Sequence, residues 1–285
     1  MPGTRGTIAL LVNSLKDDAE MLASSIRSSL MAEGWRIAVA RFDDTTGSME
    51  AINGAALLMT FGGDGTVLAA ARVAAPFGVP SWPINLGTLG FSAWVRKDEW
   101  ARRFNEAVSG QLAISERFML DVSVRRKGST VAAFSALNDG VVSGSGPAKI
   151  VTLSISINGS RLGQYRSDGL IVATPTGSTA YSLAAGGPVL DPDMEAMVFT
   201  PICPFTLSNR PIVMPGGEVI EMSVEPDQRE KTMLTVDGQQ FFDLEEGDVV
   251  IMRRSGFKAR LFRCERGAFY QVLKSKLNWS GGPDA

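Results

Sequence analysis

The chain has 285 residues and a net charge of −2, and this balance argues against a dedicated nucleic-acid binder, which usually carries a basic surface. Its two cysteines, Cys203 and Cys264, are too few for a disulfide framework or a four-cysteine zinc site, and no apolar run approaches the roughly 18 residues of a membrane-spanning helix. The absence of histidine excludes Ser-His-Asp and Cys-His hydrolases and HExxH zinc sites, so catalysis must use carboxylates, lysine, tyrosine, hydroxyl groups, backbone dipoles or a bound metal. We expect a cytoplasmic protein of one large or two ordinary domains.

The first hundred or so residues alternate short apolar runs with helical patterns. The apolar runs predict buried strands over residues 8–12, 35–39, 55–61 and 79–84. Helices are expected from Asp17 to about Gly34, over 67–75, and around Trp100 and Phe104. Such alternation is typical of a mostly parallel sheet covered on both faces, so we predict an α/β domain over residues 1–111.

From about residue 112 the pattern changes to short strands separated by turn signals. Strand candidates cover 119–125, 131–142, 150–157, 218–224, 233–236, 241–244, 249–253 and 259–263. Asn158-Gly159 between two of the apolar patterns is a strong hairpin signal. We therefore predict an antiparallel, β-sandwich-like domain over residues 112–263, followed by a C-terminal helix that contains Phe269 and Leu273.

The sharpest local motif is the loop Gly62-Gly63-Asp64-Gly65-Thr66, between a predicted buried strand and a helix. Its backbone N–H groups and the positive end of the following helix would form a phosphate site. Asp64 would repel a phosphate, so it makes more sense as a metal partner or as a base that faces a hydroxyl group. The alternative is a tight turn in which Asp64 only caps the helix. The motif lacks the Gly-Lys-Ser/Thr ending of a Walker loop and the spacing of a dinucleotide-binding GxGxxG.

A second motif runs from Asp168 through Thr176, Thr179 and Ala180 to Tyr181 and is rich in glycine and hydroxyl groups. A buried strand leads into a turn and a short helix, and Tyr181 offers an aromatic face with a polar tip. The alternative is a capped helix with Tyr181 packed in the core.

Isolated polar residues offer weaker signals. Asn138 and Asp139 could hold ribose hydroxyls or an adenine edge, although Asn138-Asp139-Gly140 is more often only a turn. Lys149 and Arg166 could each meet a diphosphate, or could be solvated cations on a strand.

Taken together and in order, these motifs resemble those of NAD kinases. The matching segments are Gly62–Thr66, Asn85–Phe91, Asn138-Asp139, Asp168–Tyr181, Gly186–Pro188, Thr200–Pro204, Arg210-Pro211 and Asp237–Gln239. The Gly-Gly-Asp-Gly core is shared with lipid kinases and phosphofructokinases, whereas the Asp168–Tyr181 segment combined with Asn138-Asp139 is much more specific.

The resemblance implies an N-terminal α/β domain, a C-terminal β-sandwich-like domain and a segment over 264–285 that returns to the first domain. It also implies transfer of a phosphoryl group from ATP, or a donor such as polyphosphate, to the 2′-hydroxyl of the adenosine ribose of NAD. A divalent metal, Mg²⁺ in the first place, would accompany the donor's phosphates. A homodimer or homotetramer with no nucleic-acid or membrane partner is expected.

The resemblance also implies roles for individual residues. Asp64 would accept the proton of the ribose hydroxyl, and the amides around Gly62, Gly63, Gly65 and Thr66 would approach the dinucleotide phosphates. The remaining binding residues are Asn138 and Asp139 for the adenosine, Asp168 for the nicotinamide end with Arg166 and Lys149 nearby, Thr179, Ala180 and Tyr181 around the adenine, and Thr176 as a further hydroxyl of the binding site. Two positions depart from the family pattern, because Phe205 stands where many relatives have histidine and Ala184 where many have serine.

Three alternatives remain open at this stage. A kinase of the same superfamily could act on a lipid or sugar hydroxyl, although no obvious amphipathic membrane-binding segment is present. A non-catalytic dinucleotide sensor would not need an aspartate that faces the acceptor hydroxyl. A dehydrogenase that uses NAD as hydride carrier is disfavoured because both GxGxxG and histidine are missing.

Overall fold

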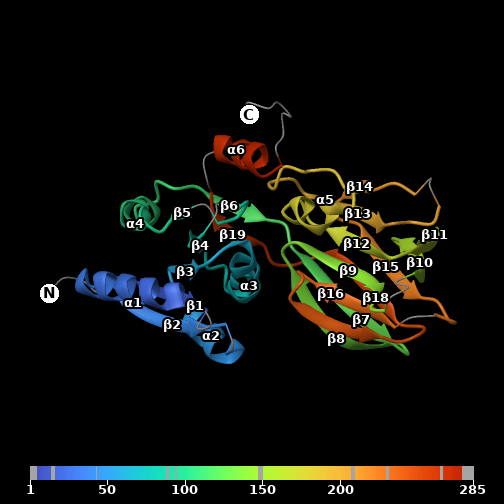
Figure 1. Ribbon diagram of the computed structural model, residues 1–285. Coiled ribbons are helices and arrows are strands. Elements are labelled where there is room, and N and C mark those ends of the chain that lie inside the picture. The colour runs from blue at the N-terminus through green and yellow to red at the C-terminus, as the bar shows by residue number, and fades with distance from the viewer. Residues whose placement is uncertain are drawn as a thin grey trace. The chain divides into compact units, whose positions relative to one another are not determined.

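The computed structural model describes residues 5–13, 17–42, 44–87, 90–93, 95–146, 150–206, 209–228, 231–263 and 266–277 (Figure 1). The chain divides into two compact units, Met1–Glu116 with Ala259–Ala285, and Arg117–Lys258. These boundaries lie a few residues from the predicted 111/112 and 263/264, because the short strands on either side of the second unit belong to the sheet of the first.

The first unit is built on a seven-stranded sheet. Its strands are β1 (Thr7–Val12), β2 (Arg36–Arg41), β3 (Leu57–Phe61), β4 (Ser81–Asn85), β5 (Val95–Arg96), β6 (Ile114–Arg117) and β19 (Ala259–Phe262). They follow the order β2-β1-β3-β4-β19-β6, and β5 also pairs with β4. The pairs β1–β2, β1–β3, β3–β4, β4–β5 and β4–β19 are all parallel. The predicted α/β architecture is confirmed.

Helices cover both faces of this sheet. They are α1 (Asp17–Ala32), α2 (Thr45–Ile52), α3 (Asp64–Ala74) with the 3₁₀ turn η1 (Ala75–Phe77), and α4 (Trp100–Val108). The last helix of this unit is α6 (Arg266–Leu277). Successive side chains of a strand point to opposite faces, and accordingly Leu10 packs in one core with Ile26 of α1, whereas Leu11 packs in another with Ala70 of α3. The strand ends that carry the polar loops are therefore held between two apolar layers.

The second unit contains two six-stranded sheets in which all the pairings between described strands are antiparallel. One sheet has the order β11-β10-β15-β18-β7-β8, with β7 (Leu120–Arg126), β8 (Ser129–Ala136), β10 (Val151–Ile157), β11 (Ser160–Ser167), β15 (Val219–Val224) and β18 (Val249–Arg254). The other has the order β14-β13-β12-β9-β16-β17, with β9 (Asp139–Gly144), β12 (Gly169–Ala173), β13 (Ala196–Ile202), β14 (Ile212–Pro215), β16 (Thr232–Val236) and β17 (Gln240–Leu244).

The two sheets share one apolar core, as expected of a sandwich. Alternate residues of each strand enter it, for example Val122 and Val124 of β7 from one sheet and Leu170 and Val172 of β12 from the other. The short helical elements η2 (Gly177–Thr179) and α5 (Tyr181–Ala184) follow β12. The predicted β-sandwich-like architecture is confirmed.

Three details differ from the sequence-based expectations. The strand expected over 259–263 in the antiparallel half is β19, which pairs in parallel with β4 through Leu261 and Ser81. The run 131–142 is not continuous, because β8 ends at Ala136 and β9 begins at Asp139. Helix α2 was not predicted, since its sequence carries few helix-forming signals beyond the Asp44 carboxylate that accepts the N–H of Gly47 at 2.9 Å. None of the described helices is long and apolar enough to cross a membrane.

Candidate active site

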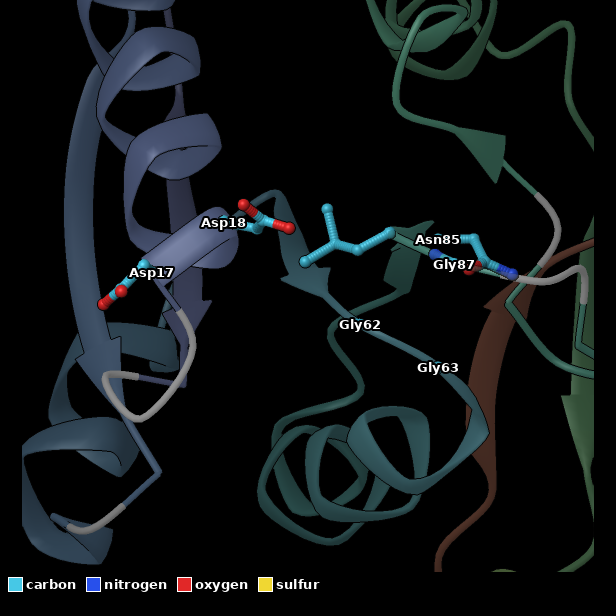
Figure 2. Close-up of a pocket in the computed structure, with 7 residues that line it drawn as sticks. Asp17, Asp18, Gly62, Gly63, Asn85 and Gly87 are labelled. Carbon is cyan, nitrogen blue, oxygen red and sulfur yellow. Dashed lines mark hydrogen bonds between the residues drawn. The ribbon is translucent and has the colours of Figure 1, made fainter.

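A cavity of about 590 Å³ opens beside the carboxyl ends of β3 and β4 (Figure 2). Seven residues line it: Asp17, Asp18, Gly62, Gly63, Asn85, Leu86 and Gly87. Figure 2 shows Asp18, at the start of α1, across the cavity from Asn85 and Gly87, with the Gly62-Gly63 backbone running below them and the Asp17 carboxylate pointing away. Ligands of parallel α/β sheets bind at this edge, where strand ends and helix N-termini meet. The predicted Gly62-Gly63 loop is thus part of a cavity of ligand size.

Asp64 is the first residue of α3 and directly follows this loop. Its Oδ1 accepts the backbone N–H groups of Ser92 at 2.9 Å and Ala93 at 3.2 Å, and its Oδ2 accepts that of Phe91 at 3.1 Å. A Cβ on Gly90 would lie 2.2 Å from Oδ1, so only glycine allows this close approach. The Asp64 side chain therefore holds the loop 90–93.

Asp64 does not cap helix α3, so the alternative interpretation of this residue as a helix cap is wrong. The N-cap of α3 is Gly63, and no side chain makes a capping hydrogen bond there. Gly65 is exposed and Thr66 is buried in the first turn of the same helix. The N-terminal end of α3 thus has no side-chain cap, and its positive dipole is available to an anionic group.

A lysine that sequence reasoning did not select lies beside Asp64. Lys276 of α6 places its Nζ 3.7 Å from Asp64 Oδ2, and both side chains are about one-third exposed, 36% and 35%. The predicted helix around Phe269 and Leu273 is present as α6. Nothing in the local sequence distinguishes Lys276 from an ordinary surface lysine, because its partner is more than 200 positions away in the chain.

Asn85 lines the cavity and also forms a hydrogen bond with the loop 90–93. This side chain, 4% exposed, donates to the Ala93 carbonyl at 2.9 Å and accepts the Gly87 N–H at 2.7 Å. The sequence motif that begins at Asn85 suggested a family resemblance but no role for this residue. Its role in the structure is to hold the turn that follows β4. Thr88 and Leu89 of the motif lie outside the described residues.

In the second unit, the turn at Asn138 and Asp139 interlocks with the turn that follows β12. The Asn138 carbonyl accepts the Thr174 N–H at 2.8 Å, and a Cβ on Gly177 would lie 2.1 Å from the same oxygen. Position 177 therefore requires glycine. The two polar motifs, which are some 35 residues apart in the chain, form one compact group.

Asp237 organises this group, and sequence reasoning assigned it no role. Its carboxylate accepts the N–H groups of Leu137 at 3.1 Å, Asn138 at 2.7 Å and Asp139 at 3.2 Å. Burial, and secondly the charge of Asp237, raises the pKa of the Asp139 carboxyl to about 7. Asp139 is 4% exposed, and in its protonated form it can both donate and accept a hydrogen bond.

The residues after Gly177 are divided between buried and exposed positions. The Thr176 hydroxyl is buried and has no hydrogen-bond partner among the described residues. Thr179 donates its hydroxyl to the Thr176 carbonyl at 3.2 Å, and Ala180 is half-buried. Tyr181 is 48% exposed, so the alternative that it packs in the core is wrong. An unsatisfied hydroxyl and an exposed ring are features of a binding surface.

Arg166 and Asp168 lie at the opposite end of β12 from this group. The five residues of β12 separate Asp168 from Thr174, and six steps of extended chain correspond to about 20 Å. The Arg166 guanidinium lies 5.4 Å from the ring centroid of Phe205, one of the two residues that depart from the family pattern. The structure therefore divides the predicted binding residues of this unit into two groups. Lys149 lies outside the described residues.

Comparisons with known proteins cover both units. The family model described as the ATP-NAD kinase N-terminal domain matches residues 13–112, and that of the ATP-NAD kinase C-terminal domain matches residues 137–264. The chain is 42% identical to an NAD kinase of Treponema denticola over 274 residues, 96% of each chain. It is 41% identical to an NAD kinase of Desulforamulus reducens over 289 residues, 98% of this chain and 99% of the relative.

Two solved structures are similar over nearly the whole chain. An NAD kinase from Archaeoglobus fulgidus in complex with ATP has a TM-score of 0.73 and 25% identity, covering 95% of this chain and 98% of that one. Yeast NADH kinase complexed with NADH has a TM-score of 0.86 at 23% identity, covering 99% of this chain and 89% of that one. At that identity the second likeness shows the fold alone.

Proposed function

The chain belongs to the NAD kinase family, and we propose that it transfers the terminal phosphoryl group of ATP to the 2′-hydroxyl of the adenosine ribose of NAD, forming NADP. The main structural support for this proposal is the position of the Asp64 carboxylate. It is about one-third exposed, and it directly follows the Gly62-Gly63 loop of the cavity. A carboxylate beside an uncapped helix N-terminus combines a proton acceptor with an anion site.

The proposed step conserves atoms and charge. The 2′-oxygen forms a bond to the γ-phosphorus while the bond from that phosphorus to the β,γ-bridging oxygen breaks, so that ADP leaves. The hydroxyl proton passes to Asp64 and from there to solvent. A carboxylate is a weak base for a ribose hydroxyl, but in a loose phosphoryl-transfer transition state the base mainly orients the hydroxyl and takes the proton late.

The remaining predicted residues would hold the dinucleotide. We assign the adenosine to the group of Asn138, Asp139 and Tyr181, because it combines a buried carboxyl and a half-buried amide with an exposed aromatic ring. The unpaired Thr176 hydroxyl supplies one more donor or acceptor there. Arg166 and Asp168, at the far end of β12, would meet the diphosphate and the nicotinamide end.

The residues around the cavity fit a divalent cation that arrives with the donor. Among the described residues, no three His, Cys, Asp or Glu side chains come together as a metal site. The Asp18 carboxylate, which lines the cavity, nevertheless offers the kind of oxygen ligand that Mg²⁺ prefers, and Mg²⁺ usually keeps phosphate and water ligands. When bound, the cation would neutralise charge on the donor's phosphates. Omission of Mg²⁺ should abolish NADP formation, and added Mg²⁺ should restore it.

The assembly and cellular location are further parts of the proposal. We infer a homodimer or homotetramer in the cytoplasm, without a nucleic-acid or membrane partner. Edge strand β14 supports the assembly, because Ile212 and Val213 are 37% and 46% exposed. Multi-angle light scattering would measure the mass of the assembly, and a monomeric mass at assay concentrations would contradict this part.

The central experiment is a coupled assay of NADP formation from NAD, ATP and Mg²⁺. Asp64→Asn should nearly abolish turnover while calorimetry still detects NAD binding, because the amide keeps the side-chain size but cannot accept the proton. Glu33→Gln, which removes an exposed ion pair with Arg5, is the matched control and should keep full activity. An equally active Asp64→Asn enzyme would remove Asp64 from its role.

The same assay separates the alternative functions. A dinucleotide sensor would bind NAD without forming NADP, and a kinase with another acceptor would phosphorylate a lipid or sugar hydroxyl in place of NAD. A panel with ATP, other triphosphates and polyphosphate would identify the donor. ATP is expected to be accepted.

A further inference from the structure

The C-terminal helix α6 contacts the loop 90–93, whose backbone N–H groups donate to the Asp64 carboxylate. Phe269 packs against Phe91 of that loop with ring centroids 6.3 Å apart. Lys276, two helical turns further on, places its Nζ 5.4 Å from the same ring centroid. Residues seven positions apart lie on one face of a helix, so this face of α6 meets the loop through an aromatic contact and a cation–π contact. The position of Lys276 is thereby fixed by its helix and by Phe91.

The two oxygens of Asp64 have different surroundings. Oδ1 accepts two backbone N–H groups, those of Ser92 and Ala93, whereas Oδ2 accepts only that of Phe91 among the described residues. Lys276 lies on the side of Oδ2, at 3.7 Å, which is beyond hydrogen-bond length. Its charge therefore attracts this oxygen without occupying a lone pair. Oδ2 is the oxygen that can still accept a hydrogen bond from an acceptor hydroxyl.

An aspartate that works next to a triphosphate has an electrostatic problem. Its negative charge repels the phosphates that must approach the acceptor hydroxyl, and this repulsion grows as the site closes and water leaves. A cation held beside the carboxylate offsets this repulsion and keeps the side chain from turning away.

We propose that Lys276 is a positioning residue for phosphoryl transfer, acting through Asp64. Its ammonium group, held over Phe91 by α6, balances the carboxylate charge and keeps Oδ2 directed at the acceptor hydroxyl. This inference rests on the proposed function. It makes the C-terminal helix part of the catalytic machinery, although α6 is far in sequence from every other motif of the site.

The test is a double-mutant cycle on kcat with Lys276→Met and Asp64→Asn. Lys276→Met alone should lower kcat about tenfold, with the KM for NAD changed less than about twofold, since only the orientation of the base is affected. In the Asp64→Asn background, single-turnover rates should change less than about twofold when Lys276→Met is added. Lys276→Arg, which keeps the positive charge, should retain most of the kcat of the unaltered protein.

A matched control comes from the same helix. Lys274 is exposed, lies two positions earlier and so faces another direction, and makes no ion pair with the residues that the structure describes. Lys274→Met should leave kcat unchanged. Thermal unfolding of both methionine variants should agree with that of the unaltered protein within about 2 °C, which excludes a loss of helix packing.

The outcomes separate the two proposals. If the unaltered protein forms no NADP, the proposed function fails. If it is active and Lys276→Met lowers the rate by the same factor with Asp64 intact and in the Asp64→Asn background, or lowers neither rate, the positioning role is wrong while the function stands. A loss that Lys276→Arg does not relieve would also overturn the charge argument.

Discussion

The backbone N–H of Asp139 donates to the Asp237 carboxylate at 3.2 Å, and the negative charge of Asp237 adds to burial in raising the pKa of the Asp139 side chain to about 7. One carboxylate thus orders the turn and at the same time disfavours the ionised form of its neighbour. This pair lies in the group that we assign to the adenosine. Its consequences can be measured without any ligand.

Asp139 should make the protein less stable as pH rises. The ordinary pKa of an aspartate, 3.8, applies to the unfolded chain, while the folded value is about 7. Below the lower value both states are protonated and the residue has no effect, whereas between the two values the folded protein retains a proton that the unfolded chain has lost. The free energy of unfolding should therefore fall from about pH 4 to about pH 7, by an amount of the order of 4 kcal/mol.

Urea unfolding as a function of pH measures this effect. Asp139→Asn should remove the decrease over this range, because an amide does not titrate. Asp227→Asn, at an exposed turn of the same unit, is the control and should leave the slope unchanged. If the pH dependence of Asp139→Asn is the same as that of the unaltered protein, the buried carboxyl is not its source.

Tyr181→Ala should weaken NAD binding more than it slows turnover. The ring is 48% exposed, so its removal leaves the core intact, and the loss of one base–aromatic contact of about 1–2 kcal/mol raises the KM for NAD roughly tenfold. Turnover at saturating NAD should change less than about threefold. Steady-state kinetics measures both quantities.

Phe241→Ala provides the comparison for this variant. Phe241 is 61% exposed on β17 of the same unit, and its replacement should affect neither constant. A fall in kcat of Tyr181→Ala at constant KM would show that the ring does not pack against the adenine.

Gly177→Ala should destabilise the second unit and reduce NAD affinity together. The added Cβ would lie 2.1 Å from the Asn138 carbonyl oxygen, so one of the two interlocked turns must move. A backbone clash of this kind costs at least about 2 kcal/mol in the free energy of unfolding. Gly217→Ala is the matched control, since a Cβ there meets nothing within 4 Å.

Urea unfolding and calorimetric titration with NAD provide the two readouts for the glycine variants. A Gly177→Ala protein with unaltered stability and NAD affinity would mean that the two turns are not coupled. Equal losses in Gly177→Ala and Gly217→Ala would point instead to a general cost of replacing glycine.

Much of the fold could be predicted locally because its determinants are local. The apolar run that ends at Phe61, followed by Gly62-Gly63 and the helical spacing after Asp64, predicts a strand, a tight turn and a helix from neighbouring residues alone. Asn158-Gly159 predicted its hairpin for the same reason, and both residues have positive φ, 50° and 75°. The strand at 259–263 was placed in the wrong sheet because strand pairing is decided over long distances in the chain.

The sequence by itself determined which residue types are available for chemistry, the strand-to-helix loop that carries Asp64, and the resemblance that names the family. Only the tertiary structure decided what those residues touch. It placed Lys276 beside Asp64, Asp237 beneath Asn138 and Asp139, and Asn85 against Ala93. The physical reason is that hydrogen bonds and ion pairs act over a few ångströms in space, whereas the partners here are brought together by the packing of sheets and helices whose order in space is not their order in the chain.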